Sequence, residues 1–363
     1  MKISQGFAVF ARAMLLVILF HAALSCLDSN GQPVEKGLFD SEEVLDLKLS
    51  GNIRNAMRDR SGKAEYQNMR ISYGVPGDVV TVPVRVKTRG HFRLTEANCL
   101  YPPLMLNFSR RNASRQCLFN GLNKIKLVTT CKAERYVVHE YLVYKLYNIV
   151  TEKSLKARLV QVTFEDTVKQ RSTDPTYGIM LEEDEDMAKR HQGKLVEGKL
   201  MRPEDTHKND FMKLAVFEYL IGNTDWSIQY QQNIKLIVID SINGPTAVAY
   251  DFDHAGIVRA SYAKPAPELE LPSTIVRRYR GYCIDDMRSF EETFSFYNSI
   301  KEQIYGVYKE CAMIDEGYRK STMEYLDDFF TTINDPKKAA ADFKYPCYKS
   351  GTGNVVITGL KKQ

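Results

Sequence analysis

Oxygen-bearing side chains gather in one short part of the chain, between residues 222 and 256. Asp225 and Asn233 precede one strand-like run, and Asp251 and Asp253 follow the next. Carboxylates and an amide on either side of a hairpin can converge at its open end. Such ligands suit Mg²⁺, which takes one or two carboxylates together with phosphate oxygens. Phosphoryl transfer needs one Asp that orients the acceptor hydroxyl, together with an Asn and a second Asp that hold the metal. The spacing indicates such a site, although Asp and Asn in turns more often mark a solvated loop.

A helix and a hairpin are expected to position these residues. Apolar side chains at positions 211, 214, 217 and 221 mark one helix face, and Gly222 is a typical terminator. Strands are predicted over 234–239 and 246–250, with a turn at Asn243-Gly244.

The first half of the chain has the pattern of a small antiparallel sheet followed by one helix. Strands are predicted at 79–87, 104–108 and 125–128, with Pro83 favouring an edge position for the first. Apolar residues at 138, 142, 146 and 149 predict a helix, and 157–164 and 177–182 predict two more strands. Residues 286–334 have a helical pattern. A strand-rich front and a helical back predict a two-lobed α+β enzyme.

Several other chemistries are excluded by the sequence. A net charge of +5 over 363 residues gives no electrostatic footprint for nucleic acid. The six histidines show no HExxH spacing, no GxSxG elbow exists, and no CxxC pair supports a zinc ribbon or a thioredoxin-like site.

The N-terminus has the features of an export signal. Residues 1–25 combine Lys2 and Arg12 with an apolar run and then small residues. That run is too short to span a bilayer, which needs about 20 apolar residues. Cleavage before Cys26 fits a general signal peptidase or a lipoprotein peptidase that leaves Cys26 to be acylated. Either way we expect a periplasmic, outer-membrane-anchored or extracellular protein, with a lipid as its only membrane contact. The six remaining cysteines are even in number and free to pair.

The chain resembles the secreted kinase-like proteins related to the spore-coat kinase CotH, an atypical branch of the protein-kinase fold. The resemblance covers about residues 75–290, in order. It is carried by these elements: Arg89-Gly90-x-x-Arg93 with Pro102-Pro103-Leu104, the lysine strand 124–128, Glu140-Tyr141-Leu142, Gly178 to Glu182, 184–190, 222–233 and 250–256. It implies a β-rich smaller lobe and a mostly helical larger lobe.

The resemblance also implies a role for each matching residue. Asp225 would be the catalytic Asp, with Asn233 binding metal beside it. Asp251 would be the principal metal ligand and Asp253 a second one. The nucleotide-binding set would comprise Lys126 or Lys124 on the phosphates, Glu140 orienting that lysine, Arg89 and Glu182. ATP and Mg²⁺ (or Mn²⁺) would be the cofactors, and a protein hydroxyl the acceptor.

The sequence departs from ordinary kinases in three ways. It lacks a GxGxxG loop before the lysine strand, spaces Asp225 and Asn233 more widely, and has Asp251-Phe252-Asp253 for Asp-Phe-Gly. A pseudokinase-type binding module and an AMP transferase therefore remain alternatives to a phosphotransferase.

The predicted organisation is one two-lobed unit behind a leader. A polar segment spans 27–75, the smaller lobe 76–182, the larger lobe 183–334 and a tail 335–363. A disulfide between Cys99 and Cys131 would tie the smaller lobe together, with Cys117 as a competing partner.

Overall fold

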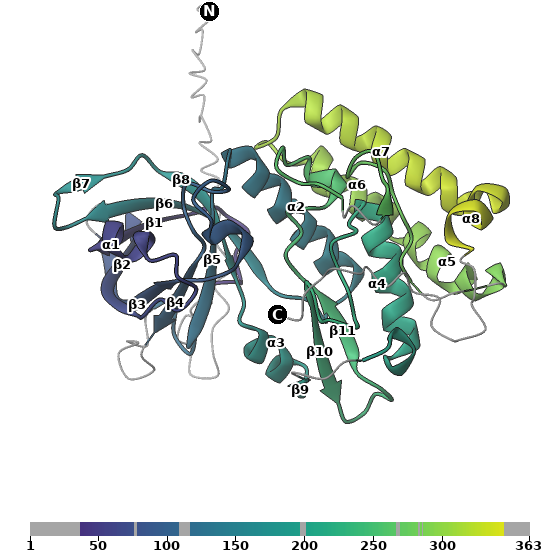
Figure 1. Ribbon diagram of the computed structural model, residues 1–363, viewed down its shortest axis with the longest axis horizontal. Coiled ribbons are helices and arrows are strands. Elements are labelled where there is room, and N and C mark those ends of the chain that lie inside the picture. The colour runs from purple at the N-terminus through teal and green to yellow at the C-terminus, as the bar shows by residue number, and fades with distance from the viewer. Residues whose placement is uncertain are drawn as a thin grey trace, which may run out of the picture.

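The computed structural model of the chain describes residues 37–75, 78–108, 117–196, 201–265, 269–281, 284 and 286–344. These residues form a mixed α+β fold, as the sequence predicted (Figure 1). A strand-rich part lies beside a helical part, and a three-stranded sheet lies below the helices in this view (Figure 1). The predicted export signal with Cys26, and residues 345–363, lie outside the described residues.

The strand-rich part is a closed barrel of seven strands. Their order around the barrel is β1 (Leu45–Gly51), β2 (Gln67–Val75), β3 (Asp78–Thr88), β4 (Leu104–Phe108), β5 (Lys124–Thr129), β8 (Thr176–Leu181) and β6 (Ala157–Asp166). Neighbours pair antiparallel except where β1 and β6 close the barrel in parallel. A two-residue strand, β7 (Arg171–Ser172), pairs with the end of β6. The small sheet that we predicted is therefore part of a barrel.

Two of the barrel strands come from the predicted polar segment 27–75. β1 and β2 flank the short helix α1 (Ile53–Arg58) and contribute apolar side chains to the barrel interior, among them Leu49 and Ile71. Closure of the barrel hides the edges that an open sheet would expose. Because residues 27–75 are mostly polar, we did not predict these two strands from the sequence.

Pro83 lies inside the barrel wall, because β3 has neighbours on both sides and is not an edge strand. The pairing of β3 with β4 runs from Thr88 to Val84 and so ends one residue before Pro83. On the other side Pro83 faces Arg70 of β2. A residue without an N–H is tolerated where the ladder on one side has ended.

Strand alternation joins the barrel to the helical part. Successive side chains of a strand point to opposite faces. On β5, Leu127 packs into the barrel interior and Val128 into the helical cluster. On β6, Val160 packs into the barrel interior and Leu159 packs against the helices. The outward residues pack with α2 (Glu134–Val150), the helix predicted from the 138–149 spacing, which lies between barrel and helices (Figure 1).

The second half supplies most of the helical part. After β8 come α3 (Asp184–Arg190) and β9 (Gly193–Val196), then α4 (Lys208–Ile221) and the predicted hairpin of β10 (Ile234–Ile239) and β11 (Thr246–Ala249). β9 pairs with β10 on the side away from β11. The remaining helices are α5 (Glu291–Ser299), α6 (Lys301–Lys309), α7 (Glu316–Asn334) and α8 (Pro336–Phe343). Short 3₁₀ turns are η1 (Phe92–Leu94), η2 (Pro203–Asp205), η3 (Gly256–Val258) and η5 (Met287–Phe290).

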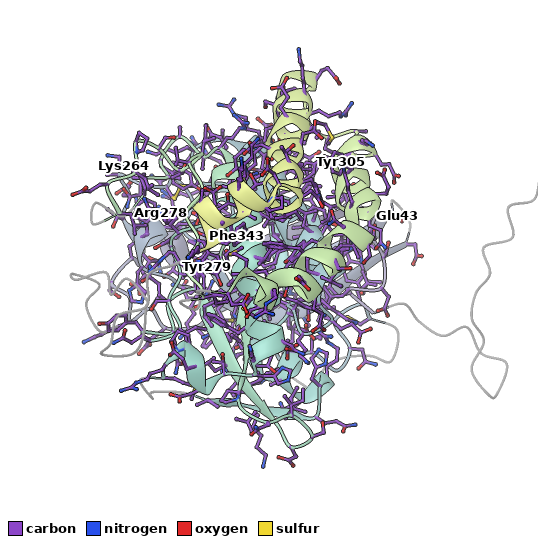
Figure 2. The ribbon with its side chains drawn as sticks, turned by 90° about the vertical axis from the view of Figure 1, so that its right-hand side faces the viewer. Glu43, Lys264, Arg278, Tyr279, Tyr305 and Phe343 are labelled. Atoms are coloured by element: carbon purple, nitrogen blue, oxygen red, sulfur yellow. A yellow bond between two sulfur atoms is a disulfide. The ribbon has the colours of Figure 1, made fainter. Side chains whose placement is uncertain are left out.

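The start of the predicted tail is part of the folded core. Asp335 caps α8 by accepting hydrogen bonds from the backbone N–H groups of Lys337 and Lys338. Phe343 at the end of α8 is fully buried beside Tyr279, with ring centroids 5.1 Å apart (Figure 2). Within the described residues, no helix combines the length and apolar character needed to cross a bilayer.

Candidate active site

Two backbone hydrogen bonds hold the candidate loops together. Helix α4 ends at Gly222, whose φ of 69° is left-handed and therefore suits glycine. The carbonyl of Gly222 accepts a hydrogen bond from the N–H of Gly256 at 3.1 Å. At the hairpin, the carbonyl of Asn233 accepts one from the N–H of Tyr250 at 3.0 Å. The loops before β10 and after β11 thus meet, as the spacing predicted.

Asp225 is held by side chains of its own loop. Gln232 donates to its Oδ1, and Asn233 Nδ2 donates to its backbone carbonyl at 2.7 Å and to its Oδ2 at 3.1 Å. His254 Nδ1 lies 3.9 Å from Oδ2. Burial raises the pKa of Asp225, and His254 acts in the opposite direction. The side chain is 35% exposed, so its carboxylate remains within reach of an acceptor.

Asp251 has a constrained backbone and an unpaired carboxylate. Its φ is 63°, and its N–H donates to the hydroxyl of Tyr144 at 2.9 Å. Asn233 is also left-handed, with a φ of 51°. Non-glycine residues held this way cluster at functional sites. Among the described residues, none donates a hydrogen bond to the Asp251 carboxylate or forms an ion pair with it. Burial and the nearby Asp253 raise its pKa.

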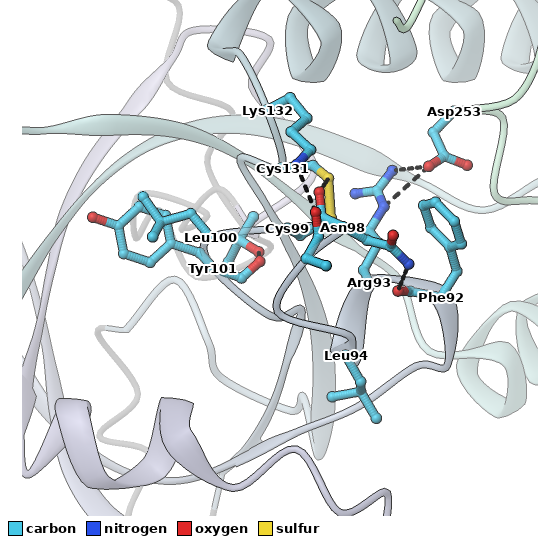
Figure 3. Close-up of a disulfide and its surroundings, with 12 residues drawn as sticks. Phe92, Arg93, Leu94, Asn98, Cys99, Leu100, Tyr101, Cys131, Lys132 and Asp253 are labelled. Carbon is cyan, nitrogen blue, oxygen red and sulfur yellow. Dashed lines mark hydrogen bonds and ion pairs between the residues drawn. A yellow bond between two sulfur atoms is a disulfide. The ribbon is translucent and has the colours of Figure 1, made fainter. Parts of the chain in front are cut away.

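Asp253 belongs to a buried ion-pair network instead. Arg93 of η1 lies 2.9 Å from Asp253 Oδ2 (Figure 3). The same guanidinium lies 2.8 Å from Glu140 Oε2 on α2. All three residues are buried. Burial works against ionisation of Asp253, but Arg93 and His254 hold its pKa below the ordinary value. Glu140 therefore pairs with Arg93 and not with the strand lysine that we expected it to orient.

A disulfide holds the segment that carries Arg93. Cys99 and Cys131 are bonded, as predicted (Figure 3). Cys117 is a buried free thiol. The bond ties the segment after η1 to the residues between β5 and α2. Arg60 reinforces the segment by donating to the carbonyls of Leu94 at 3.1 Å and Cys99 at 3.0 Å.

The lysine strand carries one buried and one partly exposed lysine. Lys126 is 3% exposed and forms an ion pair with Asp184, the first residue of α3. Asp184 Oδ2 also lies 3.2 Å from the Nζ of Lys235 on β10. Lys124 is only partly buried, although the strand period places it on the same face as Lys126.

Arg89 and Glu182, the other two residues of the expected nucleotide-binding set, both lie near Lys126. Arg89 is half-buried and close enough to lower the pKa of Lys126, which burial lowers first. Glu182 is buried at the end of β8, where it accepts hydrogen bonds from Arg190 at 2.8 Å and from the N–H of Lys156 at 3.0 Å. Its carboxylate is thereby engaged in joining β8 to α3.

Three side chains near the candidate site escaped the sequence interpretation. Asp184, Lys235 and His254 were not singled out, and Arg93 was considered only as part of the Arg89-Gly90-x-x-Arg93 element. Lys235 carries a visible signal, since it is the one charged residue inside the apolar run 234–239. The roles of the others depend on partners far away in sequence.

The donors at this site fit a hard cation that also binds phosphate. Among the described residues, no three His, Cys, Asp or Glu side chains are grouped so that they could hold a metal by themselves. Mg²⁺ beside a phosphate needs only one or two carboxylates. Asp251 offers a carboxylate without a partner, and Asn233 keeps its amide oxygen because its nitrogen is used on Asp225. Asp253 contributes less, since Arg93 already neutralises it.

Comparisons with known proteins show a distant structural similarity. No family model matches the chain, and no curated protein matches it. Among solved structures, it is similar to the proinflammatory kinase CtkA of Helicobacter pylori, with a TM-score of 0.37 and 11% identity. The match covers 64% of this chain and 89% of that one. A similarity this distant assigns neither a family nor a reaction, so the CotH resemblance stays a prediction.

Proposed function

We propose that the protein is an ATP- and Mg²⁺- or Mn²⁺-dependent phosphotransferase that acts on a protein hydroxyl. The observation that carries this proposal is the convergence of Asp225, Asn233 and the unpaired Asp251 at the open end of the β10–β11 hairpin. The barrel and the helical part would be the smaller and larger lobes of an atypical kinase-like fold. The Cys99–Cys131 disulfide supports action in an oxidising compartment outside the cytoplasm.

Each side chain has a distinct task in this proposal. Asp225 orients the acceptor hydroxyl and receives its proton at Oδ2, the oxygen nearest His254. Hydrogen bonds from Gln232 and Asn233 fix the plane of that carboxylate. Asp251 and the Asn233 amide oxygen hold the metal. A bound cation supplies charge neutralisation on the transferred group.

Labelled ATP provides the direct test. Purified full-length protein is incubated with Mg²⁺, an acceptor protein and ATP labelled at either the γ- or the α-phosphate. We expect γ-label on the acceptor, with a loss of at least about 100-fold in Asp225→Asn and Asp251→Asn. Asp240→Asn is the matched control, because Asp240 is exposed at the other end of the same hairpin.

The other outcomes distinguish the remaining functions. Transfer of α-label that depends on Asp251 would make the protein an AMP transferase. The absence of any transfer, with ATP still raising the melting temperature, would make it a nucleotide-binding module. The pairing of Asp253 with Arg93 favours that second candidate, because it leaves only one free carboxylate for metal. No ATP-dependent shift at all would contradict both.

A further inference from the structure

A cluster of opposite charges lies between the barrel and the hairpin. Lys126 on β5 and Lys235 on β10 both contact the carboxylate of Asp184, one at each oxygen. The three residues come from elements far apart in sequence, and Asp184 connects them. The carboxylate is 11% exposed and the Lys126 side chain 4%, whereas 32% of the Lys235 side chain is exposed. Lys235 is therefore the member of the cluster that solvent and ligands reach first.

An aromatic ring and a third cation complete the cluster. The Nζ atoms of Lys126 and Lys235 lie 5.5 Å and 5.2 Å from the ring centroid of Tyr250, within the range of cation–π contacts. Burial lowers the pKa of Lys126 and the nearby Arg89 adds to this, whereas Tyr250 and Asp184 raise the pKa of Lys235 although Arg89 acts against them. Tyr250 directly precedes Asp251, so the cluster adjoins the proposed metal ligand.

The number of positive charges exceeds what the local carboxylates neutralise. Four cations, Lys126, Lys235, Arg89 and Lys124, act on three carboxylates, those of Asp184, Glu183 and Asp251. A buried lysine needs a counter-ion, since an isolated buried charge is strongly unfavourable. Asp184 meets that need for Lys126 and Lys235. A polyphosphate carries more charge and more acceptor oxygens than one carboxylate, so it can replace Asp184 between the lysines.

We propose that Lys126 and Lys235 form a binding site for a polyphosphate chain, and that Asp184 is an internal counter-ion which the ligand displaces. The inference deepens the proposed function, on which it rests for identifying the chain as the phosphates of a nucleotide. It adds Lys235 and Asp184 to the residues that the sequence assigned. Asp184 thereby sets a threshold against weakly charged ligands, because a monophosphate must compete with it using fewer charges.

Binding measurements on the full-length protein test the site. Calorimetric titrations with ATP, ADP, AMP and inorganic tripolyphosphate give Kd for the wild type, Lys235→Met, Lys235→Arg and Asp184→Asn. We expect Lys235→Met to weaken ATP, ADP and tripolyphosphate at least tenfold and to change AMP less than threefold. Lys235→Arg keeps the charge and should stay within threefold of the wild type. Asp184→Asn removes the competitor and should tighten tripolyphosphate at least threefold.

A lysine on the neighbouring strand is the matched control. Lys194 lies opposite Val238 on β9 and is exposed, so Lys194→Met should leave every Kd unchanged. Circular dichroism melts establish that each variant is folded. If folded Lys235→Met binds tripolyphosphate as the wild type does, or if Asp184→Asn weakens binding, the inference is overturned.

The inorganic ligand separates this inference from the proposed function. If ATP fails to bind but tripolyphosphate binds in a manner that depends on Lys235, the nucleotide function fails and the polyphosphate site stands. If the wild type binds neither ligand, the polyphosphate site is overturned. If both bind but no label is transferred in the assay above, the site stands in a binding module.

Discussion

Arg93 and Asp253 form a buried ion pair at 2.9 Å although 160 positions separate them in the sequence. The pair joins η1, which follows the barrel strand β3, to the loop that follows the hairpin. The same guanidinium also binds Glu140 of α2. Three elements thus share one charge network beside the candidate active site. Because Arg93 neutralises Asp253, Asp251 is left as the carboxylate available to a cation.

Replacing Arg93 with methionine should destabilise the protein strongly. The change removes the guanidinium that pairs with two buried carboxylates, and breaking a buried pair this way costs about 3–5 kcal/mol. Urea denaturation at pH 7 measures the loss in the free energy of unfolding. Arg171→Met is the control, since Arg171 is exposed on β7 and its loss should cost no more than about 0.5 kcal/mol. A change below about 1 kcal/mol in Arg93→Met would refute the structural role of the network.

Removing the disulfide should lower stability through the unfolded chain. Cys99 and Cys131 are 32 residues apart, and closing a loop of this size contributes about 2–4 kcal/mol. The double variant Cys99→Ser/Cys131→Ser should therefore melt at a lower temperature, and a reductant should have no further effect on it. Cys117→Ser controls for the loss of a buried thiol that is not bonded. An unchanged melting temperature in the double variant would show that the bond does not stabilise the fold.

Glu218 should make stability fall as pH rises. This α4 residue is 1% exposed, and burial raises its pKa to about 8. Between about pH 4.5 and 8 the unfolded chain releases this proton while the folded protein retains it. The folded state binds more protons in that window, so its stability decreases with pH there. Unfolding curves at pH 5 and pH 8 should differ less in Glu218→Gln than in the wild type. An equal pH dependence in both would contradict this assignment.

Gly256→Ala should displace the loop that carries Asp253. A Cβ at this position would lie 2.2 Å from the carbonyl oxygen of Thr274, which is backbone and cannot swing away. We expect a loss of about 1–3 kcal/mol in the free energy of unfolding, together with reduced phosphotransfer. Gly306→Ala is the control, for which we expect an effect on stability of the opposite sign. It lies inside α6, where a Cβ meets nothing closer than 3.6 Å, and should stabilise by about 0.5–1 kcal/mol. Equal effects of the two substitutions would contradict the close approach at Gly256.

The sequence by itself determined the elements whose pattern is local. The spacing of apolar residues predicted α2 and α4, and the turn at Asn243-Gly244 predicted the hairpin. It also predicted that Asp225, Asn233 and Asp251 would converge, because the ends of one hairpin and of the preceding helix are necessarily close. Hydrophobic period and turn chemistry act between residues only a few positions apart, so the sequence displays them directly.

Only the tertiary structure decided how the sheet closes and which charges pair. The barrel depends on a parallel pairing between β1 and β6, strands separated by more than 100 residues. Glu140 was expected to orient a lysine, yet it binds Arg93, while Lys126 binds Asp184. A buried charge takes the counter-ion that folding brings within about 3 Å, and its own neighbours in sequence do not specify that partner. Ion-pair partners therefore depend on the assembled core, whereas helices and turns depend on local sequence.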